Sequence, residues 1–311
     1  MSRAMVIVNL YARGGMARTR WPIIKQLLKD SGLPFDCSFT ESAGHATGLA
    51  RDAVDKGYEL VIAVGGDGTV NEVVNGLVDE NGRGRATLGF ISAGTVSDFA
   101  QSVGIPQNYV KASRIFSDFG EFTIDLGAME CTGDGRKMRR LFGNTAGLGF
   151  VTDIVGGVNQ RLKILGGTAA YAIWLMPIIT NYSNKDITLS IDGQRYEERD
   201  FAILVNNGRY LGGGKVFPHA DPGDGLLDVA ILGDLSKPEA IWHLPWLYIG
   251  IHAKHPKIRM SQAKIIEVDS PQRLPVQIDG EVIGETPVSF RVVPAALNVA
   301  VQQRRRVLWR R

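Results

Sequence analysis

The sequence predicts a protein of two parts. The first is an N-terminal α/β part with a doubly wound, mostly parallel sheet, and the second is a C-terminal, antiparallel, β-sandwich-like part. The 311 residues are enough for two hydrophobic cores. Apolar strand-like runs alternate with helical patterns over the first 125 residues, whereas short strands joined by turns dominate after about residue 126. The change of pattern predicts two different architectures in one chain.

Hydrophobic periodicity, and glycines that end helices, predict the elements of the first part. The expected strands are Met5–Val8, Phe35–Thr40, Leu60–Val64 and Thr87–Ile91, and the expected helices are Trp21–Ser31, His45–Lys56, Thr69–Leu77 and Val96–Val103. Alternation of strand and helix favours a parallel sheet with helices on both faces. Ligands of such sheets bind at the carboxyl ends of the strands.

The second part reads as short strands linked by Asp-Gly turns. The expected strands are Lys137–Phe142, Ile187–Ile191, Phe201–Asn206, Leu227–Leu232, Ile265–Ser270, Pro275–Ile278, Thr286–Val292 and Leu297–Val301. We expect the α/β part to comprise residues 1–126, with residues 295–305 returning to it, and the β-rich part to comprise residues 127–294. Residues 304–311 form a basic tail.

Composition and charge argue against several classes of protein. A net charge of +3 is small for a dedicated nucleic-acid binder, so no nucleic acid is expected as a partner. The isolated Cys37 and Cys131 favour a reducing cytoplasm. The apolar start of the chain is too short for a signal peptide, and Ile164–Thr180 is too short for a transmembrane helix. We therefore expect a soluble, cytoplasmic protein.

The strongest chemical signal is the run Gly65–Glu72 (GGDGTVNE), which follows an apolar strand and opens a helix. Its three glycines let a phosphate approach the backbone closely. A helix start offers amide groups and a positive dipole end to an anion. Asp67 adds a carboxylate where Mg²⁺ and phosphate oxygens would meet. The run predicts a phosphate-binding loop, and the absence of Walker A and GxGxxG patterns disfavours P-loop and dinucleotide-binding interpretations.

Three carboxylates, Asp67, Asp98 and Asp125, fall at or just after the ends of predicted strands. Because the carboxyl ends of parallel strands meet at one edge of a sheet, we expect the three to gather there. Together they would hold a catalytic Mg²⁺ directly or through water. A carboxylate at a helix start is the alternative for Asp98, and a turn residue is the alternative for Asp125.

Motifs along most of the chain resemble those of the bacterial diacylglycerol kinase-like lipid kinases, which are related to sphingosine kinases. Besides GGDGTVNE, the matching segments are Thr40 with Gly44–Ala46, Gly94–Ala100 (GTVSDFA), Asn207–Gly214 (NGRYLGGG), Pro218–Asp228 and Asp279–Glu281 (DGE). Their order and spacing, from about residue 5 to residue 300, make the resemblance specific. The sequence departs from the family pattern at Leu10, Val96, Ser97 and Val151, which leaves lipid selectivity and the geometry of the nucleotide loop open.

The resemblance implies an ATP site in the first part and an active site in the cleft between the two parts. The residues that it assigns to the nucleotide are Asn9, Thr40, Gly65, Gly66, Asp67, Gly68, Thr69, Val70, Asn71, Glu72, Gly94 and Thr95. It assigns catalysis to Glu281 as the general base and to Asp67 as the organiser of metal and phosphate. Which of the two accepts the proton stays open, and an ordinary exposed hairpin glutamate is the alternative for Glu281.

The resemblance also implies a structural Mg²⁺ site in the second part. Its ligands would be the side chain of Asp224 and the backbone carbonyls of Asp221 and Leu226. Oxygen ligands in a turn suit a hard cation. An empty Asp-Gly turn is the alternative.

Two apolar inserts, residues 159–182 and 236–251, carry the aromatic residues Tyr171, Trp174, Trp242, Trp246 and Tyr248. Aromatic residues at helical spacing usually form core, whereas the resemblance implies that these inserts flank a lipid cleft, and Trp and Tyr suit a membrane interface. Five arginines in the tail, from Arg304 to Arg311, suit either an anionic membrane surface or a solvated terminus. We expect peripheral membrane contact through inserts and tail, and a homodimer stays open.

Three functions compete. The first is an ATP-dependent lipid kinase that transfers the γ-phosphoryl group to the hydroxyl of a diacylglycerol-like or sphingoid-like lipid. The second is a kinase of the same superfamily with a soluble substrate, such as an NAD kinase or a phosphofructokinase. The third is a catalytically silent regulator that binds lipid or nucleotide. The pair Asn71–Glu72 and the DGLLD and DGE elements favour the first. The presence of Asp67, Asp125 and Glu281 argues against the third, because a pure binder needs no base.

Overall fold

The N-terminal region of the chain is built on four parallel strands. The computed structural model describes residues 3–303 except 95, 134, 158–167, 249 and 251. The strands are β1 (Ala4–Val8), β2 (Phe35–Phe39), β3 (Leu60–Gly65) and β4 (Thr87–Ser92), in the order β4-β3-β1-β2. Every residue of β1, β3 and β4 is buried, which is typical of parallel strands covered on both faces. The predicted parallel α/β architecture is confirmed.

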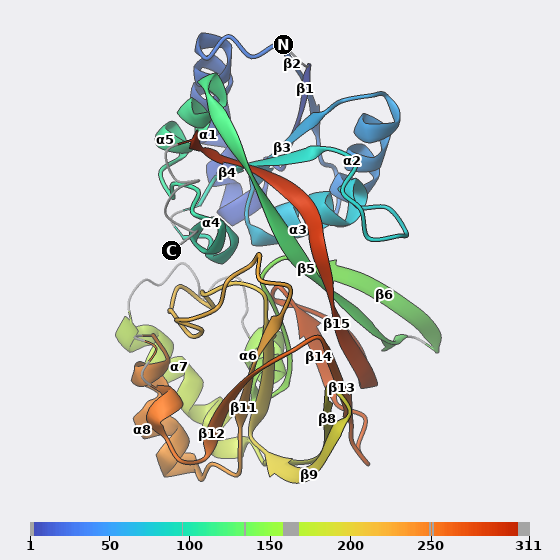
Figure 1. Cartoon of the computed structure of the whole chain (residues 1–311). Helices are drawn as coiled ribbons and strands as arrows, with labels where there is room; N and C mark the ends of the chain where they lie inside the picture. The colour runs from blue at the N-terminus through green and yellow to red at the C-terminus, as the bar shows by residue number, and fades with distance from the viewer. Residues whose placement is uncertain are drawn as a thin grey trace.

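Helices cover both faces of these strands. On one face lie α1 (Ala12–Asp30) and α5 (Tyr109–Arg114), and on the other lie α2 (His45–Asp55) and α3 (Asp67–Leu77), as Figure 1 shows. The short helix α4 (Asp98–Val103) follows β4, and the 3₁₀ helix η1 (Ile115–Ser117) follows α5. The strand–helix alternation expected from the sequence therefore produces a doubly wound region.

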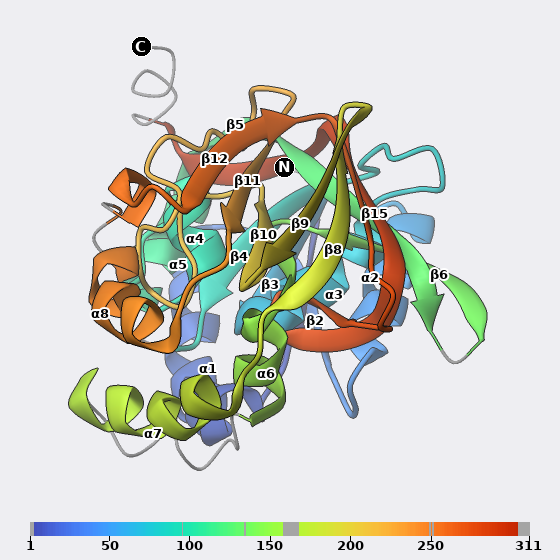
Figure 2. The same cartoon turned by 90° about the horizontal axis from the view of Figure 1, so that it is seen from below.

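The C-terminal region is antiparallel, as predicted. Its strands are β6 (Arg136–Phe142), β7 (Thr145–Gly149), β8 (Lys185–Ile191), β9 (Gln194–Asp200), β10 (Ala202–Asn206), β11 (Leu227–Leu232), β12 (Ile258–Ala263), β13 (Ile265–Asp269) and β14 (Pro275–Ile278). Its helices are α6 (Phe150–Gly157), α7 (Thr168–Asn181), α8 (Lys237–Tyr248) and the 3₁₀ helix η3 (His252–Lys254). Figure 2 shows α7 and α8 lying together on one side of this region, where they pack against each other.

Two long strands connect the regions. β5 (Phe119–Gly133) and β15 (Glu281–Gln302) run antiparallel along most of their length, with register shifts after Glu285 and after Val293. Near its end β15 also pairs in parallel with β4, at Val299 and Leu88. Figure 1 shows β5 and β15 crossing from one region to the other. The described strands consequently form one continuous hydrogen-bonded sheet that fixes the two regions relative to each other.

The hydrophobic core is divided in the same way. One cluster of buried side chains, which includes Val61, Phe90 and Val299, fills the N-terminal region. A second cluster, which includes Phe142 and Phe290, lies under the antiparallel strands. A third cluster, which includes Phe217 and Leu175, packs between the sheet and helices α7 and α8. The first cluster also includes Leu126 of β5 and Leu141 of β6, so apolar contacts reach across the junction between the regions.

Some element boundaries differ from the sequence-based expectation. Helix α1 begins at Ala12, well before the expected start at Trp21, and its first turn is irregular, because Gly14 and Gly15 have φ values of 66° and 90°. The two strands expected over 286–301 are one irregular strand, β15, because its bulges interrupt the periodicity without ending the pairing. The sequence analysis missed β7, β9 and β12 and the long strand β5.

The two apolar inserts contain helices α7 and α8. Within the described residues, no helix is both long and apolar enough to cross a membrane. Residues 304–311, which form the predicted basic tail, lie outside the described residues, as do residues 158–167 of the first insert.

Candidate functional site

The GGDGTVNE run forms the turn between β3 and α3. β3 ends at Gly65, Gly66 is the N-cap with extended backbone (φ −108°, ψ −172°), and α3 starts at Asp67. The first amides of a helix have no partner within the helix, so this end of α3 favours an anion. Gly68 is exposed, and a Cβ atom there would meet nothing within 4 Å. The first turn of α3 is therefore open to a ligand.

Close packing behind this turn requires a glycine. A Cβ atom on Gly65 would lie 2.5 Å from the Thr69 Oγ1 atom, so no larger residue fits. The Asn9 side-chain amide, just after β1, donates to Thr69 Oγ1 at 3.1 Å. The Thr40 amide, just after β2, donates to the Val8 carbonyl at 3.0 Å. The structure thus brings Asn9, Thr40 and Gly65 to the carboxyl ends of three neighbouring strands, as expected of a ligand-binding edge.

Asp67 is held against the start of α4. The Ser97 hydroxyl donates to Asp67 Oδ1 at 2.5 Å, and the Phe99 amide lies 3.4 Å from the same oxygen. Ser97 also accepts from the Ala100 amide at 3.2 Å and so caps α4. The departure from the family pattern at Ser97 therefore has a structural role, because its hydroxyl joins Asp67 to α4.

Two residues of the run have partners away from the open turn. The Val70 side chain is 2% exposed and belongs to the core. The Glu72 Oε2 atom accepts from the Ala46 amide at 3.0 Å, and the Glu72 carbonyl accepts from the Thr47 hydroxyl at 2.9 Å. Glu72 therefore anchors the start of α2 on α3.

Asn71 connects the run to the C-terminal region. Its Nδ2 atom donates to Asp279 Oδ2 at 2.8 Å and to the Leu141 carbonyl at 3.0 Å. One turn later, the Asn75 side chain donates to the Leu141 carbonyl and accepts from the Leu141 amide, both at 2.9 Å. Helix α3 is thereby bound along one side to strand β6 and to the DGE turn.

The DGE turn places Asp279 at the junction of the two regions. Asp279 adopts φ +47°, and its Oδ1 atom accepts from the Thr145 amide at 2.8 Å. Burial raises the pKa of Asp279 to about 7, and the negative charges of Asp67 and Asp98 add to the shift. The hydrogen bonds from Thr145 and Asn71 oppose it. The charges of Asp67 and Asp98 therefore act on Asp279 across the junction.

Glu281 stands at the start of β15, next to the turn. Its side chain is 63% exposed and forms an ion pair with Arg140 of β6 at 3.3 Å. The sequence analysis did not single out Arg140, because no spacing rule links a β6 arginine to a turn far along the chain.

Asp98 ties the start of α4 to the glycine-rich loop of the C-terminal region. Its Oδ2 atom accepts from the Gly212 amide at 2.6 Å, and its Oδ1 atom accepts from the Gly213 amide at 2.8 Å. Gly212 and Gly213 both have positive φ, which turns successive amides toward one carboxylate. Asp98 and the amides of Gly212 and Gly213 therefore link the two regions, and we call this link the clasp.

Asp125 belongs to a different group of carboxylates. It is 2% exposed, and its oxygens accept from the Gly225 amide at 2.6 Å and the Ala295 amide at 2.7 Å. Its negative charge contributes to the raised pKa of Asp224. The three carboxylates expected at one edge are thus divided between two places, with Asp67 and Asp98 near Asp279 and Asp125 near Asp224. Among the described residues, no three His, Cys, Asp or Glu side chains are placed to hold a metal ion together.

The turn expected to bind Mg²⁺ has a surplus of negative charge. Burial raises the pKa of Asp224, the Leu226 amide opposes the shift, and the charges of Asp221 and Asp125 add to it. Burial, followed by the charges of Asp224 and Asp221, raises the pKa of Asp228 to about 6. The buried Asp228 Oδ2 atom has no hydrogen-bond partner in the structure. Oxygen donors with this surplus of charge fit a hard cation.

The loop after β4 has a brace that the sequence analysis missed. Arg20 of α1 donates from Nη1 to the Ala93 carbonyl at 2.9 Å and to the Gly94 carbonyl at 3.0 Å. Its guanidinium lies over the ring of Tyr109, 5.0 Å from the ring centroid. Helix α1 therefore holds the backbone at Gly94 in place through Arg20. Thr95, which the sequence analysis assigned to the nucleotide, lies outside the described residues.

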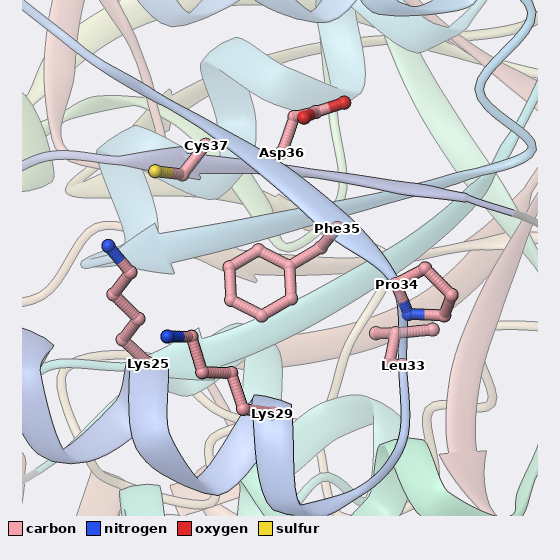
Figure 3. Close-up of a pocket in the computed structure, with 7 residues that line it drawn as sticks. All are labelled: Lys25, Lys29, Leu33, Pro34, Phe35, Asp36 and Cys37. Carbon is pink, nitrogen blue, oxygen red and sulfur yellow. The ribbon is translucent and has the colours of Figure 1, made fainter.

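A surface pocket lies elsewhere on the N-terminal region. Figure 3 shows its lining, which comes from α1, the following turn and β2: Lys25, Lys29, Leu33, Pro34, Phe35, Asp36 and Cys37. β2 is the last strand at that end of the sheet. None of the predicted site residues lines this pocket, so it does not belong to the junction described above.

Two family models match the chain in succession. The diacylglycerol kinase catalytic domain matches residues 3–129, and the YegS C-terminal NAD kinase beta sandwich-like domain matches residues 149–301. The matches fall on the N-terminal and C-terminal regions.

Relatives of similar length support the same family. A diacylglycerol kinase of Bacillus subtilis (strain 168) is 30% identical over 292 residues, which cover 93% of each chain. A diacylglycerol kinase of Staphylococcus carnosus (strain TM300) is 29% identical over 289 residues, which cover 93% of this chain and 91% of the relative. A solved structure described as a candidate diacylglycerol kinase from Bacillus anthracis str. Sterne has a TM-score of 0.79 and 26% identity, covering 96% of this chain and 94% of that one. The chain therefore belongs to the diacylglycerol kinase family.

Proposed function

We propose that this protein is an ATP-dependent lipid kinase that transfers the γ-phosphoryl group of ATP to the hydroxyl of a diacylglycerol-like or sphingoid-like lipid. The observation that supports this most is the contact between Asn71 and Asp279 at 2.8 Å. It joins the helix of the GGDG run to the DGE turn. Phosphoryl transfer depends on holding donor and acceptor in register, and a direct link between these elements supplies such a register.

In this proposal the triphosphate lies on the open first turn of α3. The exposed Gly68 admits phosphate oxygens, while the Asn9–Thr69 hydrogen bond stiffens the turn behind them. Arg20 donates to the Gly94 carbonyl and so steadies the loop that follows the neighbouring strand β4. These residues bind and orient the nucleotide, which is a large part of what a kinase contributes to the reaction.

Glu281 is the proposed general base. Its side chain is 63% exposed and therefore accessible to a lipid hydroxyl that enters the junction. A base must come within hydrogen-bond reach of the proton that it removes. Asp67 lies across the junction and is the proposed organiser of phosphate and metal, because Ser97 and the Phe99 amide hold its Oδ1 atom in place.

Mg²⁺ is the proposed cofactor at two places. At the turn of residues 221–226, the Asp224 carboxylate with the Asp221 and Leu226 carbonyls would hold the ion, and the raised pKa values of Asp224 and Asp228 support a cation there. At the junction, Asp67 and Asp98 would bind the ion that accompanies the phosphates. Asp125 would support the ion at the turn of residues 221–226, because its carboxylate accepts a hydrogen bond from the Gly225 amide. When bound, the ion at the junction would neutralise negative charge on the phosphates.

Helices α7 and α8 are the proposed surface for membrane contact. Trp242 is 71% exposed, Trp246 is 40% exposed and Met176 is 44% exposed. Trp242 and Trp246 are four residues apart, so they lie on the same face of α8. Exposed tryptophans of this kind suit the interface of a bilayer, where a lipid substrate resides. The side chains of Tyr171, Trp174 and Tyr248, named with them in the sequence analysis, lie outside the described ones.

The decisive experiment incubates the protein with radiolabelled ATP, Mg²⁺ and mixed micelles of total extracted lipids, and identifies the labelled product by mass spectrometry. We expect label in a lipid fraction, in amounts that rise with the lipid content of the micelles. Bound ATP without transfer to any acceptor would favour a silent regulator.

A soluble acceptor is the second candidate, because the model that matches residues 149–301 describes an NAD kinase-like β sandwich. NAD and sugar phosphates therefore belong in the same assay. Transfer to one of them, with no transfer to lipid, would overturn the lipid-kinase proposal.

A further inference from the structure

We infer that Arg140 of β6 is a positioning residue that holds Asn71 and Glu281 in the arrangement needed for transfer. The inference rests on the proposed function. Arg140 lies between the two family-model matches, which end at residue 129 and resume at residue 149. Neither match covers this strand, so we derive the role of Arg140 from its contacts.

The Arg140 guanidinium makes contacts with both regions of the molecule. Its Nε and Nη2 atoms lie 3.4 and 3.2 Å from Asn71 Oδ1 on helix α3. Its Nη2 atom lies 3.3 Å from Glu281 Oε2 on β15. The Arg140 side chain is only 27% exposed, so solvent screens these contacts less than at an open surface. One rigid planar group thus spans the helix of the GGDG run and the proposed base.

The contact with Asn71 determines which way its amide points. Asn71 Oδ1 faces donors only, namely Arg140 and the Asn75 side chain at 3.3 Å. Asn71 Nδ2 faces acceptors only, namely Asp279 Oδ2 at 2.8 Å and the Leu141 carbonyl at 3.0 Å. Turning the amide over would place its NH₂ group against a guanidinium. Arg140 therefore ensures that a donor faces Asp279.

The hydrogen bond from Asn71 Nδ2 helps to hold Asp279 in place, because negatively charged side chains lie near the Asp279 carboxylate. The charges of Asp67 and Asp98 act on it, and the Asn71 hydrogen bond is one of the contacts that offset them. If Asn71 rotates, an amide oxygen faces the Asp279 carboxylate and pushes the DGE turn away from α3. Loss of Arg140 therefore disturbs Asp279 through Asn71 and disturbs Glu281 directly.

Arg139 provides a matched control on the same strand. It also carries a guanidinium, but its contacts are Glu130 at 3.8 Å and the Glu80 carbonyl at 3.4 Å, both away from the turn. Successive residues of a strand point to opposite faces, so Arg139 and Arg140 have separate surroundings.

The test compares Arg140→Gln and Arg139→Gln in full-length protein, by initial rates of lipid phosphorylation and by calorimetric ATP binding. We expect Arg140→Gln to lower kcat about 10- to 100-fold with the Kd for ATP within about two-fold, because displacing a catalytic group by about 1 Å has effects of this size. Arg139→Gln should keep the wild-type kcat. Equal kcat values for wild type and Arg140→Gln would overturn the inference.

A conservative variant and a double variant test the mechanism. Arg140→Lys should recover only part of the activity, because one ammonium lacks the separate prongs that reach Asn71 and Glu281. In a Glu281→Gln background, Arg140→Gln should add little further loss, because both act on the same step. Full recovery by lysine, or effects that multiply independently, would contradict the proposed geometry.

A stability measurement decides the inference even if the wild type transfers no phosphate, an outcome that would refute the proposed function instead. The Tm losses of Arg140→Gln and Asp279→Asn should be non-additive by about 2–4 °C, because Asn71 connects the two side chains. Strictly additive losses would show that Arg140 does not act through Asn71.

Discussion

The side chain of Asn71 donates to the carboxylate of Asp279 at 2.8 Å, across 208 residues of chain. Asn71 belongs to the helix of the GGDG run, and Asp279 opens the DGE turn. The same junction holds Asp98 against the Gly212 and Gly213 amides. Polar contacts therefore join the two regions at the motifs that the sequence analysis singled out, namely the GGDGTVNE run, the GTVSDFA segment, the NGRYLGGG segment and the DGE turn.

Removal of the proposed base should abolish most transfer without affecting the nucleotide. Glu281→Gln keeps the shape of the side chain but cannot take a proton, so turnover should fall about 10²- to 10⁴-fold. The Kd for ATP should change little, because Glu281 stands outside the first turn of α3. Glu285→Gln on the same strand, where Glu285 pairs with Arg273, is the control. Unchanged turnover in Glu281→Gln would remove Glu281 from the mechanism.

Gly68→Ala tests whether phosphate lies on the open turn of α3. A Cβ atom at Gly68 meets no atom of the surrounding structure within 4 Å, so the variant should fold with a Tm at least equal to that of the wild type. A bound phosphate would occupy that space, and ATP affinity should fall at least about 10-fold, which corresponds to about 1.4 kcal/mol. Gly48→Ala on α2, which also meets nothing within 4 Å, should bind ATP normally. Normal binding by Gly68→Ala would place the phosphates elsewhere.

Asp98→Asn should weaken the clasp between the regions. The substitution leaves one acceptor oxygen for two amide donors and turns an NH₂ group toward the other amide, which costs about 1–3 kcal/mol. We expect a lower Tm and a higher KM for the lipid, since the Gly212–Gly213 loop comes from the C-terminal region. Differential scanning calorimetry and initial rates measure the two effects. A Tm equal to that of the wild type would show that the clasp contributes nothing to stability.

Asp200 makes stability depend on pH. Both of its carboxylate oxygens are buried without a hydrogen-bond partner. Burial raises its pKa from 3.8 to about 7, the charges of Glu198 and Asp234 add to the shift, and Arg259 opposes it. The folded protein then keeps a proton that the unfolded chain releases near pH 4. The resulting stabilisation is present at acid pH and is lost as the pH rises from about 4 to about 7.

Asp200→Asn should remove this dependence, because an amide stays neutral. At pH 8 the variant should be more stable than the wild type by an amount on the order of 2–4 kcal/mol, and the difference should shrink toward pH 4.5. Denaturant unfolding at several pH values measures it. A difference that stays constant with pH would mean that Asp200 is ionised in the folded protein throughout this range.

Mg²⁺ should stabilise the protein through the turn at Asp224. At a concentration of 100 times its Kd, a cation that binds only the folded state adds about 2.7 kcal/mol. The gain should diminish below pH 6, where protons compete for Asp224 and Asp228, whose pKa values are raised. Asp224→Ala should lose the gain, whereas Asp192→Ala, at the Asp-Gly turn between β8 and β9, should retain it. An equal Mg²⁺ effect in both variants would argue against the site.

Much of the fold was predictable because its signals are local. The alternation of buried strands such as Leu60–Gly65 with helices such as Asp67–Leu77 is visible in hydrophobic periodicity. The glycines of Gly65–Gly68 predict a tight turn from local sequence alone. Strands β7 and β9 were harder to find, because the small residues of β7 and the charged residues of β9 carry little periodic signal.

The candidate site was predictable only in part. Placement of Asp67 near a helix start follows from local pattern, and so does a turn at Asp279. The grouping of Asp125 with Asp224, rather than with Asp67, could not be predicted, because it depends on how β5 crosses between the regions. The same is true of Arg140, whose contacts join β6, α3 and β15.

The sequence by itself determined the class of each region, the phosphate-binding run and the family resemblance, because these depend on residues close together along the chain. The tertiary structure decided which carboxylates meet, which way Asn71 points and which arginine reaches Glu281. These outcomes depend on the register of β5, β6 and β15, and register is set by packing over the whole sheet.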